Sequence, residues 1–98
     1  MAELEYRKLT GDEVAAELTA LTGWAVENEK LSKRFSFNTY KDGLVFALAV
    51  GQVADQMNHH PDLEVGYARV HVSVYTHAVN GLSPFDFELA RRIEILLA

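Results

Sequence analysis

The stretch that decides the fold is DLEVGYARVHVSVYTHAVNGLSPFD, residues 62–86. Apolar residues alternate with polar or aromatic ones in its centre, which predicts a strand with one buried face. The apolar face carries Val70, Val72 and Val74. The opposite face carries His71, Ser73, Tyr75 and His77. Leu63, Val65 and Tyr67 alternate in the same way, so a shorter strand is expected just before it.

A helix is expected at the end of this stretch and beyond it. Asn80-Gly81 predicts a turn, and Ser83 is then placed to cap a helix. Pro84 occupies the first helical position, where proline is favoured, and Asp86 occupies the third, as in a capping box. The apolar stripe of this helix is Phe85, Leu89, Ile93, Leu96 and Leu97.

Upstream, a long helix is expected from Asn38 or Thr39 to about Asn58, with Pro61 ending it. Its apolar residues form two faces rather than one stripe. One face is Leu44, Ala47, Leu48 and Gly51; the other is Phe46, Val50, Val53 and Met57. A helix that is apolar nearly all round must be covered on more than one side. We therefore expect the sheet on one side and a second subunit on the other, giving a homodimer or homotetramer through this helix and the sheet edge.

The N-terminal part predicts one helix and two strands. Thr10 and Glu13 have capping-box spacing, an apolar stripe follows over residues 14–21, and Gly23 marks the end. Alternation predicts strands at Trp24-Val26 and Phe35-Phe37, joined by the polar connection Glu27 to Lys33. The whole chain, residues 1–98, thus predicts a single α+β domain with a four-stranded antiparallel sheet and helices packed on it, in the order αββαββα.

Composition excludes several classes of function. The net charge is −5 and the basic residues are scattered, which argues against a nucleic-acid partner. Without cysteine there is no disulfide and no thiolate metal site. The longest apolar run, Leu44 to Val50, is too short to cross a membrane, and the first residues do not resemble a secretion signal. We expect a cytoplasmic protein.

The histidines are the candidates for chemistry. His59-His60-Pro61 follows a helix, and His77 ends a strand. His71 lies six residues before His77, about 20 Å away in a strand, so it is left out. One alternative is a metal site built from Asp55, His59 and His77, although adjacent histidines lack the spacing of paired helical ligands. The other is general acid–base catalysis, because imidazole can both give and take a proton near neutral pH.

The spacing Asp55-x3-His59-His60-Pro61-x5-Tyr67-x9-His77-x8-Asp86 resembles the signature of the pterin-4a-carbinolamine dehydratases. The likeness extends over most of the chain, from about Leu9 to Ile95. It includes Gly23-Trp24, Phe35-Ser36-Phe37, residues 54–58 and Gly81-Leu82. One departure is Leu63, where many members carry an aromatic residue after the His-His-Pro triplet.

The resemblance implies a reaction and its residues. Members remove the 4a-hydroxyl of 4a-hydroxytetrahydrobiopterin as water, giving quinonoid dihydropterin without metal or organic cofactor, and so support tetrahydrobiopterin recycling. By carry-over His59, His60 and His77 are catalytic, with His59 and His77 as acid and base and His60 gripping substrate. The same carry-over makes Asp55, Pro61, Tyr67 and Asp86 substrate-binding.

Alternatives remain for several of these assignments. Asp55 is expected either to orient His59 or to be a solvated helix charge. Asp86 is expected either to act in the site or only to cap the last helix. Tyr67 is expected either to form a wall of the pocket or to pack in the core. For the whole protein, one alternative is a non-enzymatic oligomerisation partner of a transcription factor. Another is a pterin-binding homologue in molybdopterin metabolism.

Overall fold

The computed structural model describes residues 4–98; residues 1–3 of the expected domain lie outside the described part. The elements are α1 (Gly11–Leu18), β1 (Ala25–Glu27), β2 (Lys30–Ser36), α2 (Tyr40–Met57), β3 (Asp62–Gly66), β4 (Arg69–Val74), the 3₁₀ turn η1 (His77–Val79) and α3 (Pro84–Leu96). Apart from the short turn η1, this is the expected order αββαββα. The fold class predicted from the sequence is confirmed.

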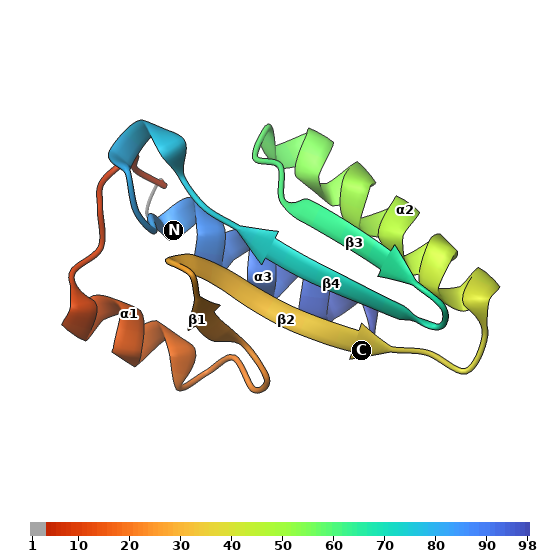
Figure 1. The fold of residues 1–98 in the computed structure, drawn as a ribbon. Coiled ribbons are helices and arrows are strands. Elements are labelled where there is room, and N and C mark those ends of the chain that lie inside the picture. The colour runs from red at the N-terminus through yellow and green to blue at the C-terminus, as the bar shows by residue number, and fades with distance from the viewer. Residues whose placement is uncertain (1–3) are drawn as a thin grey trace.

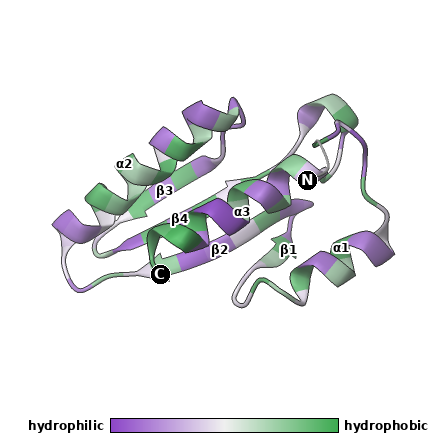
Figure 2. Cartoon of the chain, turned by 180° about the vertical axis from the view of Figure 1, so that it is seen from behind, coloured by the Kyte–Doolittle hydropathy of each residue, from purple (hydrophilic) through white to green (hydrophobic). Residues whose placement is uncertain are grey.

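The four strands form one antiparallel sheet in the order β1-β2-β4-β3. Helices α2 and α3 lie side by side on one face of this sheet, and the other face is open (Figures 1 and 2). Alternation decides which residues face the helices: Val70, Val72 and Val74 of β4 are at most 2% exposed. They pack in one apolar cluster with Leu31 of β2 and Ile93 of α3.

The connection between β1 and β2 is much shorter than predicted. The polar stretch Glu27 to Lys33 is not a loop: only Asn28 and Glu29 form the turn, and β2 begins at Lys30. Both turn residues have positive φ, 50° and 67°, as two-residue hairpins of the right twist require. The tight turn puts Leu31 into the core, where it is fully buried.

Helix α2 ends where it was expected to end, at about Asn58, but Asn58 rather than Pro61 provides the cap. Its last residue is Met57, and Asn58 takes the left-handed conformation at φ 49°. The Asn58 and His59 amides donate back to the last carbonyls of the helix, so the chain reverses there. Pro61 comes after the reversal. This cap decides where the two neighbouring histidines point.

The two apolar faces predicted for α2 are both present. The inner face includes Phe46, Val50 and Ala54, all at most 5% exposed. On the outer face Leu44 is 42% and Leu48 77% exposed, so no described part of the chain covers it. No helix within residues 4–98 is long and apolar enough to span a membrane.

Candidate functional site

One end of the sheet gathers the segments that carry the predicted site residues. Asp62, the first residue of β3, pairs with Ser73 near the end of β4. The loop that leaves α2 therefore lies beside the loop that leaves β4, and α3 begins nearby (Figure 1). His59, His60, His77 and Asp86 all belong to these segments.

Asp86 is a fully enclosed polar residue of this region, as is Ser83. Its side chain is fully buried at the third position of α3. One carboxylate oxygen, Oδ1, lies 2.6 Å from Nε2 of His59. The other, Oδ2, accepts hydrogen bonds from the Thr76 hydroxyl at 2.7 Å and from the Ser83 backbone N–H at 2.9 Å. Asp86 is thus both the capping-box residue of α3 and the hydrogen-bond partner of a histidine, so it is not only a cap, and its part in the chemistry stays a prediction.

This carboxylate selects the form of the His59 ring. An acceptor oxygen at 2.6 Å requires a proton on Nε2, because two lone pairs would otherwise face each other. Among the described residues, Nδ1 of His59 has no hydrogen-bond partner. It is also not one of the side-chain nitrogen or oxygen atoms that are both shielded from solvent and without a hydrogen bond. The ring of Phe85 flanks the imidazole, with centroids 5.7 Å apart. His59 is held at one nitrogen and available at the other.

His60 points the other way, out of the core. Its Nε2 lies 2.9 Å from Oδ1 of Asp55, and both side chains are exposed. The sequence suggested that Asp55 would orient His59, and this is wrong: Asp55 contacts His60. Both residues, together with Pro61 and Leu63, line a groove of about 570 Å³ against the outer face of α2. Neither His59 nor His77 is part of that lining.

His77 lies beyond the end of β4, not in the strand. It begins the 3₁₀ turn η1, is exposed, and its ring meets the Tyr75 ring edge-on at 5.1 Å. Its chain neighbour Thr76 is bonded to Asp86, which is bonded to His59. Two hydrogen bonds therefore connect the segment of His77 to the ring of His59, while His60 faces the separate groove.

Tyr67 lies apart from these residues. It is 76% exposed and stacks on Tyr40, at the first residue of α2, with centroids 6.3 Å apart. Helix α2 has 18 residues and so spans about 27 Å, which separates Tyr40 from the histidine end. Tyr67 does not pack in the core, and within one chain it lies apart from the histidines, so its part in substrate binding stays a prediction.

The alternative metal site is not assembled either. Asp55 contacts His60 rather than His59, and His59 is directed into the core toward Asp86. Within residues 4–98 no group of three or more histidine, aspartate or glutamate side chains is arranged to hold a metal ion. The metal ligands proposed from spacing therefore do not lie together: His59 is in the core beside Asp86, and Asp55 is in the groove beside His60.

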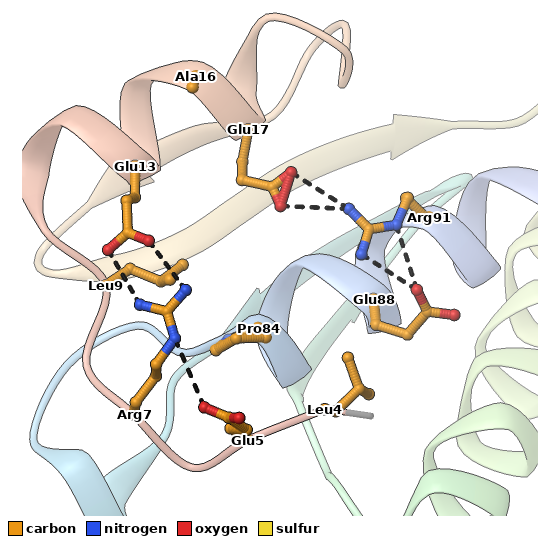
Figure 3. A pocket seen from close by; sticks show the side chains of 10 residues that line it. All are labelled: Leu4, Glu5, Arg7, Leu9, Glu13, Ala16, Glu17, Pro84, Glu88 and Arg91. Atoms are coloured by element: carbon orange, nitrogen blue, oxygen red, sulfur yellow. Dashed lines mark hydrogen bonds and ion pairs between the residues drawn. The ribbon is translucent and has the colours of Figure 1, made fainter. Parts of the chain in front are cut away.

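A larger cavity of about 730 Å³ lies elsewhere, between the N-terminal segment, α1 and the start of α3 (Figure 3). Both arginines that line it are engaged in ion pairs: Arg7 pairs with Glu13, and Arg91 with Glu17 and Glu88. The hydrogen bond from Arg7 lowers the pKa of Glu13 to about 2. Side chains committed to such pairs are poorly suited to proton transfer, so we do not place the chemistry in this cavity.

Sequence reasoning missed Thr76 and the aromatic pair beside His59. Tyr6 stacks on Phe85 with centroids 4.3 Å apart, next to the His59 ring. Nothing in the sequence near Tyr6 indicates this contact. Thr76 had a signal, because it continues the alternate series of Val70, Val72 and Val74 onto the buried face, where a hydroxyl needs a partner.

Comparisons with known proteins show the family of this chain. Residues 7–96 match the family model described as pterin 4 alpha carbinolamine dehydratase. A protein of Sulfurisphaera tokodaii named "Putative pterin-4-alpha-carbinolamine dehydratase" is 38% identical over 93% of this chain and 98% of its own length. One of the same name from Sulfolobus acidocaldarius is 41% identical over 88% and 94%.

Solved structures show the same fold. The crystal structure of a transcriptional coactivator/pterin dehydratase from Brucella melitensis superposes with a TM-score of 0.88 at 29% identity, covering 93% of this chain and 99% of that one. A pterin dehydratase-like protein, identified as a RuBisCO assembly factor in the alpha-carboxysome, has a TM-score of 0.66 at 22% identity, over 76% and 88%. That second likeness concerns the fold alone. Together with the family match, these relatives establish that the chain belongs to the pterin 4 alpha carbinolamine dehydratase family.

Proposed function

We propose that this protein dehydrates 4a-hydroxytetrahydrobiopterin to quinonoid dihydropterin and water, with histidines as general acid and base, and so supports tetrahydrobiopterin recycling. In this reaction the C4a–O bond breaks, the hydroxyl leaves as water after taking up a proton, and N5 loses its proton as the C4a–N5 double bond forms. The step needs two proton transfers and no redox change. Family membership supports the dehydratase activity, and the assignment to individual residues is our proposal.

The observation that carries the assignment is the pair of His59 and Asp86. A fully buried carboxylate 2.6 Å from Nε2 orients the ring and leaves Nδ1 to exchange a proton with a bound substrate. A positioned imidazole of this kind is the ordinary device of general acid–base catalysis. We assign His59 and His77 as the acid–base pair, since Thr76 and Asp86 connect their segments.

The remaining residues would bind substrate. His60, Asp55 and Pro61 line the groove against α2, where hydrogen-bonding groups stand beside apolar ones. Such a surface suits a flat ring with polar edges. In this proposal His60 grips the pterin at the end of the groove next to its chain neighbour His59, so that the ring reaches from the groove to the acid–base pair, and Asp55 holds His60 in place through the 2.9 Å contact. Leu63 lines the same groove and offers an aliphatic rather than aromatic contact.

Dehydration kinetics test the proposal. The protein is mixed with chemically prepared 4a-hydroxytetrahydrobiopterin, and formation of quinonoid dihydropterin is followed against the uncatalysed reaction. His59→Ala and His77→Ala should each lower kcat by about 10²–10⁴-fold. His60→Ala should mainly raise KM. His71→Ala is the matched control, because His71 lies on the open face of the sheet, and it should keep the rate. An unchanged kcat for His77→Ala would refute the acid–base assignment.

The outer face of α2 favours a second role, association with another chain. Leu44, Val45 and Leu48 are exposed at 42%, 56% and 77%, and residues 44–51 carry no charge. An apolar face of this kind fits a second copy of itself around a two-fold axis. We propose a homodimer or homotetramer formed through this face and the sheet edge. Sedimentation of the pure protein tests it, and a monomer at micromolar concentration would contradict it.

The same face could serve a transcription factor instead, as the oligomerisation partner considered from the sequence. The Brucella melitensis protein is called a transcriptional coactivator as well as a pterin dehydratase, and that role is stated of that protein alone. The kinetic experiment separates the two functions. A chain that associates but never accelerates dehydration, with or without its histidines, would favour the non-enzymatic function over the dehydratase.

A further inference from the structure

Thr76 is a buried polar residue that the proposed function uses only as a connection between the His77 segment and Asp86. It is 2% exposed, lies two residues beyond the end of β4 and directly precedes His77. Its hydroxyl lies 2.7 Å from Oδ2 of Asp86 and 2.8 Å from the hydroxyl of Ser83. These two partners satisfy the buried hydroxyl, which would lower the free energy of unfolding if it were left without a hydrogen bond.

The direction of these hydrogen bonds follows from counting protons. Asp86 Oδ2 only accepts, so the single proton of the Thr76 hydroxyl goes to it. The Ser83 hydroxyl must then donate to Thr76, and it accepts in turn from the Phe85 backbone N–H. A chain of donors that all point the same way ends on the carboxylate that holds His59.

The backbone of Thr76 holds the loop that carries His77. Its N–H donates to the Gly81 carbonyl at 3.0 Å, and its carbonyl accepts from the amides of Gly81 and Val79 at 3.4 and 3.2 Å. These bonds close the loop at residues 76 and 81. One residue thus fixes the base of the His77 loop by its backbone and the partner of His59 by its side chain.

We propose that Thr76 is a positioning residue that sets the two histidines relative to each other. Its hydroxyl orients the Asp86 carboxylate, which keeps the His59 proton on Nε2, while its backbone holds the loop of His77. The consequence for catalysis rests on the proposed dehydratase function; the consequence for the His59 ring does not.

Loss of the hydroxyl should release the carboxylate. Rotation about the Cβ–Cγ bond of aspartate has broad minima, so hydrogen bonds rather than torsional preference hold its orientation. Without Thr76, Oδ2 would keep only the Ser83 N–H at 2.9 Å. Asp86 could then turn away from His59, and both neutral forms of the ring would be populated.

The first test uses the whole chain labelled with ¹⁵N and no ligand. Long-range ¹H–¹⁵N spectra at about pH 8, where histidines are mostly neutral, report which ring nitrogen carries the proton. Thr76→Val removes the hydroxyl and keeps a β-branched side chain suited to the extended backbone. We expect a single Nε2–H form of His59 in wild type and in Thr76→Ser, and a mixture in Thr76→Val. Thr76→Ala provides the same comparison should the valine methyl not fit.

Thr39→Val is the matched control. It makes the same exchange at the cap of α2, at the opposite end of that helix from His59, and should leave the His59 signal unchanged. An Nε2–H form that persists unmixed in both Thr76→Val and Thr76→Ala would overturn the proposal.

Kinetics form the second test. Losing a hydrogen bond to a charged group corresponds to a fall in kcat of about 10- to 100-fold, with KM within about threefold and recovery in Thr76→Ser. If Thr76→Val shows a mixture of the two neutral forms of His59 but an unchanged kcat, the proposed effect of Thr76 on catalysis is overturned. If wild type itself does not dehydrate the pterin, the proposed function fails, while the spectra still decide the role of Thr76.

Discussion

The substitution Asp86→Asn should reverse the proton on His59. Two donors, the Thr76 hydroxyl and the Ser83 N–H, face Oδ2, so the amide oxygen of the asparagine would take that position. Its NH₂ group would then face Nε2 of His59, where the wild-type oxygen lies at 2.6 Å. An NH₂ group donates, so Nε2 would have to accept and the proton would move to Nδ1. The nitrogen available to substrate would have the wrong form.

The structure gives a magnitude for both consequences. A buried hydrogen bond to a charged group contributes about 1.5–3 kcal/mol and a neutral one about 0.5–1.5 kcal/mol, so the exchange should cost about 1–2 kcal/mol in the free energy of unfolding. For a domain of this length that corresponds to a Tm lower by about 4–15 °C. The kinetic loss should be larger, about 10²–10⁴-fold in kcat, because an asparagine in the equivalent position of a serine protease triad costs about 10⁴-fold through the wrong tautomer.

Urea unfolding and stopped-flow dehydration measure the two effects on the same preparation. Asp42→Asn is the control, since Asp42 is an exposed carboxylate in the first turn of α2 and should change neither quantity appreciably. Reasoning from the Asp86 contacts would be refuted by a folded Asp86→Asn protein whose kcat stays within about threefold of wild type. A large loss of stability with normal kcat would reduce Asp86 to its role as a helix cap.

Three further predictions concern the surface and the core. Leu48→Glu should weaken self-association by about 10²–10⁴-fold, because Leu48 is 77% exposed and burying a leucine contributes about 1.5–3 kcal/mol, which counts twice across a two-fold axis. Sedimentation of this variant should show a monomer. Ile95→Glu is the control, because Ile95 is 70% exposed on α3, and it should not change the assembly. The hydrogen bond from Arg7 lowers the pKa of the Glu13 carboxyl to about 2, and an NMR titration should find its midpoint near that value. The contribution of this pair to stability should be complete above about pH 4.5 and lost as the pH falls toward 2. A midpoint near 4.5 would mean that the pair does not form in solution. Leu31→Ala should cost about 2–5 kcal/mol in urea unfolding, since Leu31 is fully buried, and a loss below 1 kcal/mol would contradict the short β1–β2 turn that places it in the core.

Much of the fold could be predicted because local rules agreed with the final packing. The caps at Thr10 and Ser83 form with both hydrogen bonds of a capping box, so the starts of α1 and α3 were determined within a few residues of sequence. Alternation in β4 correctly placed its valines in the core, because a sheet covered on one face buries every second residue.

The two chain reversals could not be predicted as well. The turn at Asn28-Glu29 and the cap at Asn58 both place residues other than glycine at positive φ. Such a conformation is uncommon, and a proline downstream is a stronger signal in sequence. The connection between β1 and β2 therefore looked longer than it is. The end of α2, expected at about Asn58, was predicted to within one residue, but the reversal of the chain at Asn58 was not.

The cap at Asn58 also explains the wrong partner assigned to Asp55. Residues four apart face each other only while the helix continues, and α2 stops at Met57. The left-handed Asn58 turns the chain, so His60 rather than His59 comes back to Asp55 at 2.9 Å, and His59 enters the core. A rule about helical spacing failed because the helix had already ended.

The pairing of His59 with Asp86 is long-range, yet part of it could have been deduced. Thr76 follows Val70, Val72 and Val74 on the buried face, and Asp86 lies on the first turn of a helix that packs on that face. A buried hydroxyl and a buried carboxylate at neighbouring ends of a strand and a helix must satisfy each other, since no water is available to them. Thr76 and Ser83 both donate to Oδ2 of the carboxylate, so the second oxygen, Oδ1, needs one more donor. What sequence lacks is the direction of the chain at Asn58, which determines that the donor is His59.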